Sequence, residues 1–431
     1  DCRPERVSGG RRPDIRCFHD GLIIGIEASY DGRDAEEDAR NRIDQGLVDL
    51  AIALQYPQRY PGMRTEDLIE LVRRSTFNVK IIAPGYVKAE SLLGFISNKL
   101  GGRQVASTGW FSVDVPTLAG IIKHAVDYLV QEQEVQDELK SINKKIKNFV
   151  EALNNQSIVE RIHREMYKLY GLQSPTVNEI ILAQAALSLL LTATFYEHVR
   201  NHHASLQPLS SHVQAKGPIE GFKEALDELL KIDYREAVRL AREILNALPP
   251  NAAGMVRKLV EEGVKIAQNR VLLRHDFAGR VYHKITGDLA VEKGFATFYT
   301  QVPAAYLLAT LATRALLGLE GDLKSAIDGV SKPEELVERV RGIKIADFAC
   351  GSGTLLTASH SALMDVLRAL THYKDLDIDL DEAGRRIIED CVYGIDALKY
   401  AAQITAINLA LTGPGSITKE NIHTIYLGYI P

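Results

Sequence analysis

The sequence contains 431 residues, of which 46% are hydrophobic and 25% charged, a balance typical of a soluble protein whose length allows two to four domains. The formal net charge of -5 argues against nucleic acid as a partner without excluding it, because charge can be separated between faces and domains. The four cysteines lack zinc-type spacing, and residues 1–12 lack the apolar core of a signal peptide, so a reducing cytoplasm is the expected compartment.

Residues 1–115 mix short strand-like runs with a helical pattern. Residues 22–28 and 79–83 are apolar runs of strand length. Residues 40–54 carry apolar side chains at helical spacing and predict a helix between them. This order of strand, helix and strand predicts an N-terminal α/β module.

Two acidic residues in this module stand out. Asp14 follows Pro13 directly, and Glu27 lies in the strand-like run, two residues before Ser29. The layout resembles the PD-(D/E)xK nuclease core, which implies that Asp14 and Glu27 are catalytic residues that ligate Mg²⁺. Ser29 occupies the place of the lysine that assists the attacking water, and Lys80 on the next strand is a candidate replacement. The alternative is an ordinary pair of strands that carries surface acids.

Residues 116–290 carry helical patterns almost throughout. Apolar residues between 135 and 153 alternate steps of four and three, which predicts a short seam packed inside a helical bundle. Residues 180–196 carry no charge and approach the length of a membrane span. Polar side chains within this stretch and glutamates on both sides favour a buried helix, so no membrane partner is expected.

Residues 291–431 alternate between strand and helix again. Strands are predicted at residues 343–348 and 392–395, each followed by an apolar helix. This pattern is typical of the doubly wound sheet of Rossmann-like domains. The expected fold is therefore multidomain α/β, with an N-terminal nuclease-like module at 1–115, a helical connector at 116–290 and a Rossmann-like domain at 291–431.

A glycine loop links the first of these strands to its helix. Gly351 and Gly353 permit backbone angles that are closed to other residues and let a ligand approach the main chain. Asp396 ends the next strand, where a carboxylate can accept hydrogen bonds from both hydroxyls of a ribose. A P-loop is excluded because no Lys-Ser or Lys-Thr follows, and the NAD fingerprint lacks its third glycine. A generic nucleotide loop, or a turn without a ligand, remains the alternative to an S-adenosylmethionine site.

Three segments resemble the gamma-class amino methyltransferases. Residues 347–356, DFACGSGTLL, are similar to motif I of that class, and residues 294–308, GFATFYTQVPAAYLL, are similar to motif X. Residues 394–396 and the helix after them resemble motif II. The order X, I, II is that of the gamma class, and the resemblance covers residues 275–431. It implies methyl transfer from S-adenosylmethionine to adenine N6 in DNA.

The resemblance also implies the roles of individual residues. A first group of three residues would line the methionine end of the cofactor, and a second group of four would form the loop beneath it. A third group has two residues, of which the first would hold the ribose and the second would lie near the adenine ring. Cys350 is interpreted as a small loop residue rather than a nucleophile. These groups are Tyr299, Thr300 and Pro303; Asp347, Ala349, Gly351 and Gly353; and Asp396 and Ala397.

The sequence departs from the family in one respect. The catalytic N-P-P-Y or N-P-P-F element, which clamps a flipped adenine, does not occur before Pro431, and no target-recognition domain is apparent. The methyltransferase domain is therefore expected to be incomplete. The order of the modules resembles a type IIG restriction–modification polypeptide that acts on double-stranded DNA, with endonuclease activity as an open question. One alternative is a non-cleaving defence or assembly subunit that works with partner subunits; another is a methyltransferase for RNA or protein.

Overall fold

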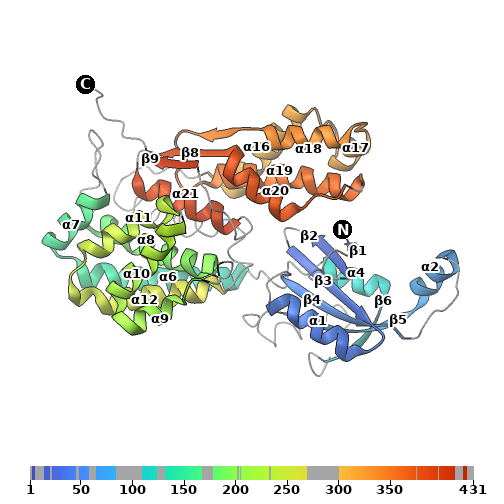
Figure 1. Ribbon diagram of the computed structural model, residues 1–431, viewed down its shortest axis with the longest axis horizontal. Coiled ribbons are helices and arrows are strands. Elements are labelled where there is room, and N and C mark those ends of the chain that lie inside the picture. Colours follow the sequence, from blue (N-terminus) through green and yellow to red (C-terminus); the bar gives the residue numbers. More distant parts are fainter. Residues whose placement is uncertain are drawn as a thin grey trace. The chain divides into compact units, whose positions relative to one another are not determined.

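The computed structural model gives an α/β protein in which helices predominate (Figure 1). Its contacts divide the chain into two compact units, Asp1–Val135 and Gln136–Pro431. The first unit extends beyond the predicted boundary at residue 115, and the predicted boundary near 290 falls inside the second. The structure describes residues 2–4, 14–19, 22–44, 48–57, 65–83, 109–123, 132–166, 178–200, 203, 205–232, 234–268, 300–374, 376–396, 398–412 and 421–424.

The first unit is built on a mixed six-stranded sheet in the order β1-β2-β3-β4-β5-β6. β1, β2 and β3 form an antiparallel meander, β3 and β4 are parallel, and the remaining pairs are antiparallel. The parallel step requires a crossover, which is supplied by the helix α1 (Gly32–Asp44). The strands are Cys2–Pro4, Ile15–His19, Leu22–Ser29, Leu50–Gln55, Thr76–Ile82 and Phe111–Asp114.

One predicted element of this unit is wrong. The helical pattern over residues 40–54 ends with α1 at Asp44, and Leu50–Gln55 forms the strand β4. Every residue from Leu50 to Leu54 is buried, because β4 has a neighbour on both edges and a helix over one face. A strand in that position is apolar along its whole length, so periodicity does not separate it from a helix.

The core of the first unit lies between α1 and the sheet. Ala35 and Ala39 of α1 pack against Ala51 and Ala53 of β4 and Ile82 of β5. The small side chains let the helix approach the sheet closely. Two further helices, α2 (Thr65–Arg74) and α4 (Val115–Lys123), belong to this unit.

Cys17 of β2 forms a disulfide bond. In the antiparallel pair of β1 and β2, Cys17 lies opposite Cys2.

The second unit contains a helical bundle. The predicted seam between residues 135 and 153 is confirmed in α6, where Leu139, Ile142, Ile146 and Phe149 are buried. The bundle helices are α6 (Glu132–Leu153), α7 (Gln156–Met166), α8 (Asn178–Arg200), α9 (Leu209–Lys216), α10 (Pro218–Ile232), α11 (Arg235–Ala247) and α12 (Ala253–Ala267).

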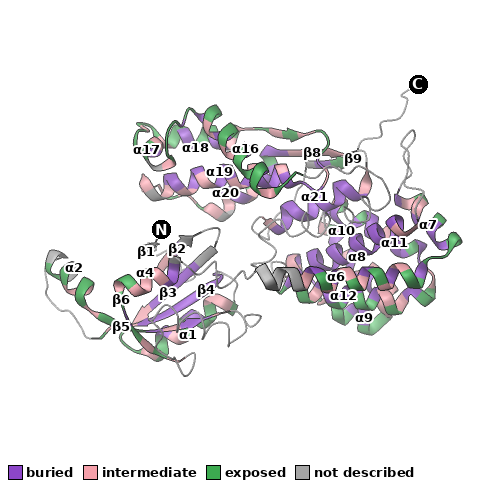
Figure 2. Cartoon of the chain, turned by 180° about the vertical axis from the view of Figure 1, so that it is seen from behind, coloured by how far each residue is buried: buried purple, intermediate pink, exposed green. Residues whose placement is uncertain are grey.

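The helix α8 forms the centre of this bundle (Figure 2). It is the one described helix that is long and apolar enough to cross a membrane, and 94% of its most apolar window is buried inside the protein. The prediction of a buried bundle helix is therefore confirmed.

The second unit continues into a parallel three-stranded sheet in the order β7-β8-β9. Helices connect successive strands, as the predicted pattern for residues 343–411 requires. A short π-helical segment, Ile387–Cys391, leads into β8. The remaining elements are α16 (Val302–Leu317), α17 (Leu323–Asp328), α18 (Pro333–Gly342), β7 (Ile345–Asp347), α19 (Thr354–Tyr373), α20 (Leu380–Arg386), β8 (Val392–Asp396), α21 (Lys399–Thr412) and β9 (Asn421–Thr424).

The helix α21 joins this sheet to the bundle. Its Gln403 is buried; it donates to Thr192 Oγ1 at 2.9 Å and to the Ala237 carbonyl at 3.0 Å, and accepts from Ser188 Oγ at 2.5 Å. Lys399 at the start of α21 reaches Glu243 of α11 at 3.1 Å. Because a buried amide needs its partners, these bonds fix the position of α21 on α8 and α11.

Candidate functional site

The glycine loop follows β7 at the carboxyl end of the parallel sheet. Gly351 and Gly353 have φ angles of 57° and 81°, in the left-handed region that favours glycine. A Cβ on Gly353 would lie 2.9 Å from Thr405 Cγ2, whereas a Cβ on Gly351 would meet no atom within 4 Å. The main chain at Gly351 therefore borders open space, which a ligand could enter, and Gly353 is needed for close packing against α21.

Asp396 connects the end of β8 to this loop. Its Oδ2 accepts from the Gly351 N–H at 2.9 Å, and its Oδ1 accepts from the Leu398 N–H at 2.9 Å. The Cys350 N–H also donates to the Ile395 carbonyl at 3.0 Å, so the loop is tied to β8 twice. A carboxylate oxygen has two lone pairs, and each oxygen of Asp396 keeps one for a further donor.

Residues of α21 hold the loop from the other side. Thr405 Oγ1 donates to the Gly351 carbonyl at 2.8 Å, and Asn408 Nδ2 donates to the Ser352 carbonyl at 3.1 Å. Asp347 caps the start of the loop by accepting from the Ala349 N–H at 3.0 Å. These bonds fix the loop in the absence of a ligand. A ligand that binds there would therefore not have to bear the entropy cost of ordering the loop.

Cys350 has the inert character that the sequence predicts. The pKa of its thiol is raised to about 12, mainly by burial and in smaller part by the charges of Asp396 and Asp347, and a hydrogen bond with Thr405 opposes this shift. The thiol is therefore protonated at neutral pH, and a nucleophilic cysteine requires the thiolate.

Two of the remaining predicted cofactor residues lie at the beginning of α16. Thr300 and Pro303 are exposed at the beginning of this helix, which packs its Ala305 and Ala309 against Ala358 and Ala362 of α19. The helix therefore runs beside the one that leaves the glycine loop. Tyr299 and Ala397 lie outside the described residues.

The two acids of the nuclease-like layout come together in the first unit. Ile15 pairs with Ile26, which places Asp14 beside Glu27 at the end of the ladder between β2 and β3. Asp14 Oδ2 accepts from the Ala28 N–H at 2.8 Å. Glu27 is buried beneath α1, and Arg42 of that helix donates to its Oε1 at 2.5 Å. Burial raises the pKa of Glu27, Arg42 lowers it, and the charges of Asp14 and Asp38 raise it.

Lys80 lies on the same face as Glu27, two strands away. Glu27 pairs with Ala53 across β3 and β4, and Ala53 pairs with Lys80 across β4 and β5. The two backbones are about 10 Å apart at that spacing. Lys80 Nζ binds Glu36 of α1 at 2.7 Å, while Ser29 Oγ accepts from the Asp31 N–H at 3.2 Å. Lys80 thus shares the face of the predicted site, and Ser29 serves the turn before α1.

The arrangement does not fit a divalent cation as it stands. Within the described part of the chain, no three His, Cys, Asp or Glu side chains are grouped so that they could hold a metal. Mg²⁺ prefers octahedral oxygen coordination, and one of the two carboxylates here is already paired with a guanidinium group. A cation at Asp14 and Glu27 would have to replace Arg42, so the Mg²⁺ site stays a prediction.

No family model and no curated protein matches this chain. Interpretation of the two sites therefore depends on their geometry. Three residues that matter to this geometry were absent from the predicted sites: Thr405 and Asn408, which hold the glycine loop, and Arg42, which pairs with Glu27. Sequence offers a signal only for Asn408, which lies in the NLAL ending of the segment that resembles motif II.

Proposed function

We propose that this chain binds S-adenosylmethionine at the glycine loop and forms the cofactor-binding part of a methyltransferase that modifies adenine N6 in double-stranded DNA, as in restriction–modification systems. The observation that carries the proposal is the position of Asp396. Its carboxylate meets the Gly351 N–H while one lone pair on each oxygen stays available, an arrangement that suits the two hydroxyls of a ribose.

The residues of the loop fit the cofactor in two further ways. The main chain at Gly351 is open to an approaching ligand, and Thr405 and Asn408 keep the loop in place. When bound, S-adenosylmethionine supplies an electrophilic methyl group on its sulfonium. This chain's residues bind and orient that cofactor, and since the 431 residues contain no N-P-P-Y or N-P-P-F, no transfer step is assigned to them. A cytoplasmic location stays a prediction, and the disulfide bond at Cys17 is unusual for a reducing compartment.

Calorimetry tests the ribose contact. Asp396→Asn should weaken the binding of S-adenosylmethionine and of S-adenosylhomocysteine by tenfold or more, about 1.4 kcal/mol, because a neutral amide replaces a charged acceptor. Asp328→Asn, a change of the same size at an exposed position in α17, is the control and should leave both affinities unchanged. Equal affinity of the Asp396→Asn variant and the wild type would refute the ribose contact.

A second candidate is a non-cleaving defence or assembly subunit that binds cofactor and DNA with a partner. The bond between Arg42 and Glu27 favours it, since that bond occupies one of the two acids that a nuclease needs. A cleavage assay with target DNA, Mg²⁺ and cofactor decides between the candidates. If the wild type cuts the DNA and Asp14→Ala abolishes the cutting, the chain is a nuclease. If the wild type does not cut the DNA, the result agrees with the second candidate.

A further inference from the structure

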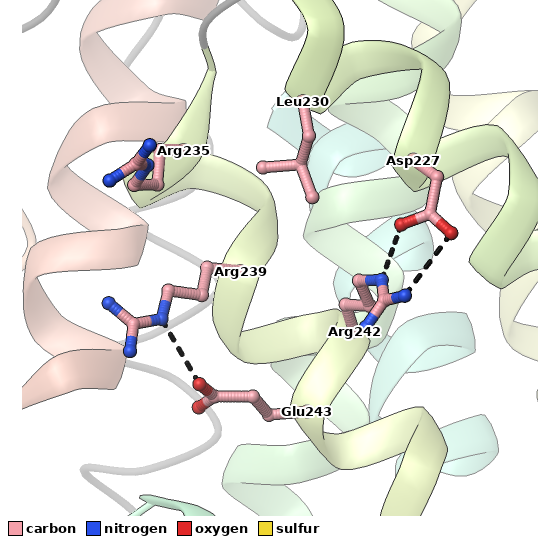
Figure 3. Close-up of a pocket in the computed structure, with 6 residues that line it drawn as sticks. All are labelled: Asp227, Leu230, Arg235, Arg239, Arg242 and Glu243. Carbon is pink, nitrogen blue, oxygen red and sulfur yellow. Dashed lines mark hydrogen bonds and ion pairs between the residues drawn. The ribbon is translucent and has the colours of Figure 1, made fainter.

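A cavity of about 570 Å³ opens between α10 and α11 of the bundle (Figure 3). It is large enough for a small ligand or for part of a polymer. Its lining is rich in charge, and three of its side chains are arginines on a single helix. We call it the arginine groove, and its residues are Asp227, Leu230, Arg235, Arg239, Arg242 and Glu243.

The arginines differ in how far their donors are engaged. Arg239 uses its Nε to bind Glu243 at 3.1 Å, which leaves both of its Nη groups. Arg242 is clamped by the two oxygens of Asp227, with its Nη2 at 3.2 Å from Oδ2. Arg235 is exposed, and the nearby carboxylate of Glu236 interacts with its charge. A guanidinium group has five N–H donors, so each arginine can still donate to an additional ligand.

The charge of the groove is positive although that of the whole chain is negative. The lining carries three guanidinium groups and two carboxylates, and one of those carboxylates, Glu243, is shared with Lys399 of α21 at 3.1 Å. The nearby carboxylate of Glu236 also interacts with the charges of Arg235, Arg239 and Lys399, and the four cations still outnumber the three anions. Arg235 also occupies the first position of α11, where the helix dipole disfavours a cation. An anion is therefore the ligand that this lining would stabilise, and the planar fork of arginine suits phosphate.

The spacing of the arginines favours an extended anion over a small one. The three lie one helical turn apart in succession, so the row from Arg235 to Arg242 is about 10 Å long. One strand of B-DNA advances about 3.4 Å along the duplex axis for each phosphate, and neighbouring phosphates lie about 7 Å apart in space because the strand winds around that axis, so the row spans two neighbouring phosphates. We infer that the arginine groove binds the phosphate backbone of double-stranded DNA. The choice of DNA over other phosphodiesters rests on the proposed function, whereas the anion site rests on the groove itself.

Fluorescence anisotropy with a labelled DNA duplex tests the groove in the full chain. The variant that combines Arg235→Gln and Arg239→Gln should bind the duplex at least tenfold more weakly. It should also reduce the slope of log affinity against log salt concentration by about two, because two phosphate contacts are lost. The single variant Arg242→Gln should reduce the slope by less than one, because the charge of Arg242 is already paired with Asp227. A loss of affinity in these variants could come from the removal of charge anywhere on the protein or from its removal at the groove.

A matched control separates the two. Arg257→Gln combined with Lys258→Gln removes the same charge from exposed positions on α12, and should change the duplex affinity less than twofold. Equal weakening by the groove and control variants would overturn the inference. So would full displacement of the duplex by inorganic phosphate, which would indicate a small-anion site, or a single-stranded RNA that binds the groove more tightly than the duplex.

Cofactor binding distinguishes failure of the groove from failure of the proposed function. Calorimetry with S-adenosylmethionine should give the same affinity for the wild type and the groove variants. If the cofactor binds and the groove variants retain the duplex, the groove inference alone is wrong. If the wild type binds no cofactor but loses the duplex when the groove is changed, the proposed function is wrong and the groove stands.

Discussion

Two carboxylates at the candidate sites are held in contrasting ways. Asp396 in the second unit accepts from two backbone N–H groups, at Gly351 and Leu398. Glu27 in the first unit is buried and paired with the guanidinium group of Arg42. Backbone donors fix a carboxylate while leaving its charge and some lone pairs for a neutral ligand. A buried cation neutralises the charge instead, and a metal would have to compete with it.

The difference between the two carboxylates should have its largest effect on the stability of the first unit, where Glu27 depends on Arg42. Arg42→Met should destabilise it by about 3–5 kcal/mol near neutral pH, because the buried carboxylate of Glu27 would remain without its cation. Urea unfolding measures this change. Arg40→Met, which removes an exposed partner of Glu36, should cost less than about 1 kcal/mol.

The same variant makes a prediction about pH. Burial raises the pKa of Glu27, and loss of Arg42 raises it further. A carboxyl group whose pKa is raised in the folded state destabilises the fold when it is ionised. The defect of Arg42→Met should therefore be full at neutral pH and shrink as the pH falls through the raised pKa of Glu27. A defect that does not change with pH, or one that Glu27→Gln fails to relieve in the double variant, would contradict a charge-pair role for Arg42.

A smaller effect is expected at the glycine loop. Gly353→Ala should destabilise the second unit by about 3 kcal/mol, because it adds a left-handed backbone penalty to a Cβ contact with Thr405 at 2.9 Å. Gly321→Ala is the matched control. Gly321 has φ 78° but open space around its Cβ, so its substitution should cost about 1–2 kcal/mol. Equal unfolding free energies for the two variants would show that α21 does not support the loop through this contact.

The sequence predicts local features of the fold better than it predicts contacts between distant segments. The glycine loop, Asp396 and the seam of α6 depend on short patterns, and each lies where those patterns place it. The helical pattern over residues 40–54 also covers the strand β4, because an interior strand is apolar at every position. The bond from Arg42 to Glu27 depends on how α1 crosses the sheet, which residue spacing does not determine.

The same limit applies within the candidate site. Asp347 and Ala349 form a turn that spans two residues, so sequence suffices to place them together. Thr405 meets Gly351 over a separation of 54 residues, and Gln403 meets Ser188 over 215. Such contacts follow from the packing of whole helices, and a single sequence carries no direct sign of them.

The docking of α21 has a consequence for how this protein can be divided. Twelve of its residues, from Tyr400 to Leu411, are buried, and its polar groups are matched to acceptors on α8 and α11 as well as on the glycine loop. A fragment that begins near residue 290 would contain α21 without α8 and α11, the two helices against which it packs. The glycine loop and the bundle therefore belong to one compact unit, and we expect a cut at the boundary that the sequence suggests to destabilise both parts.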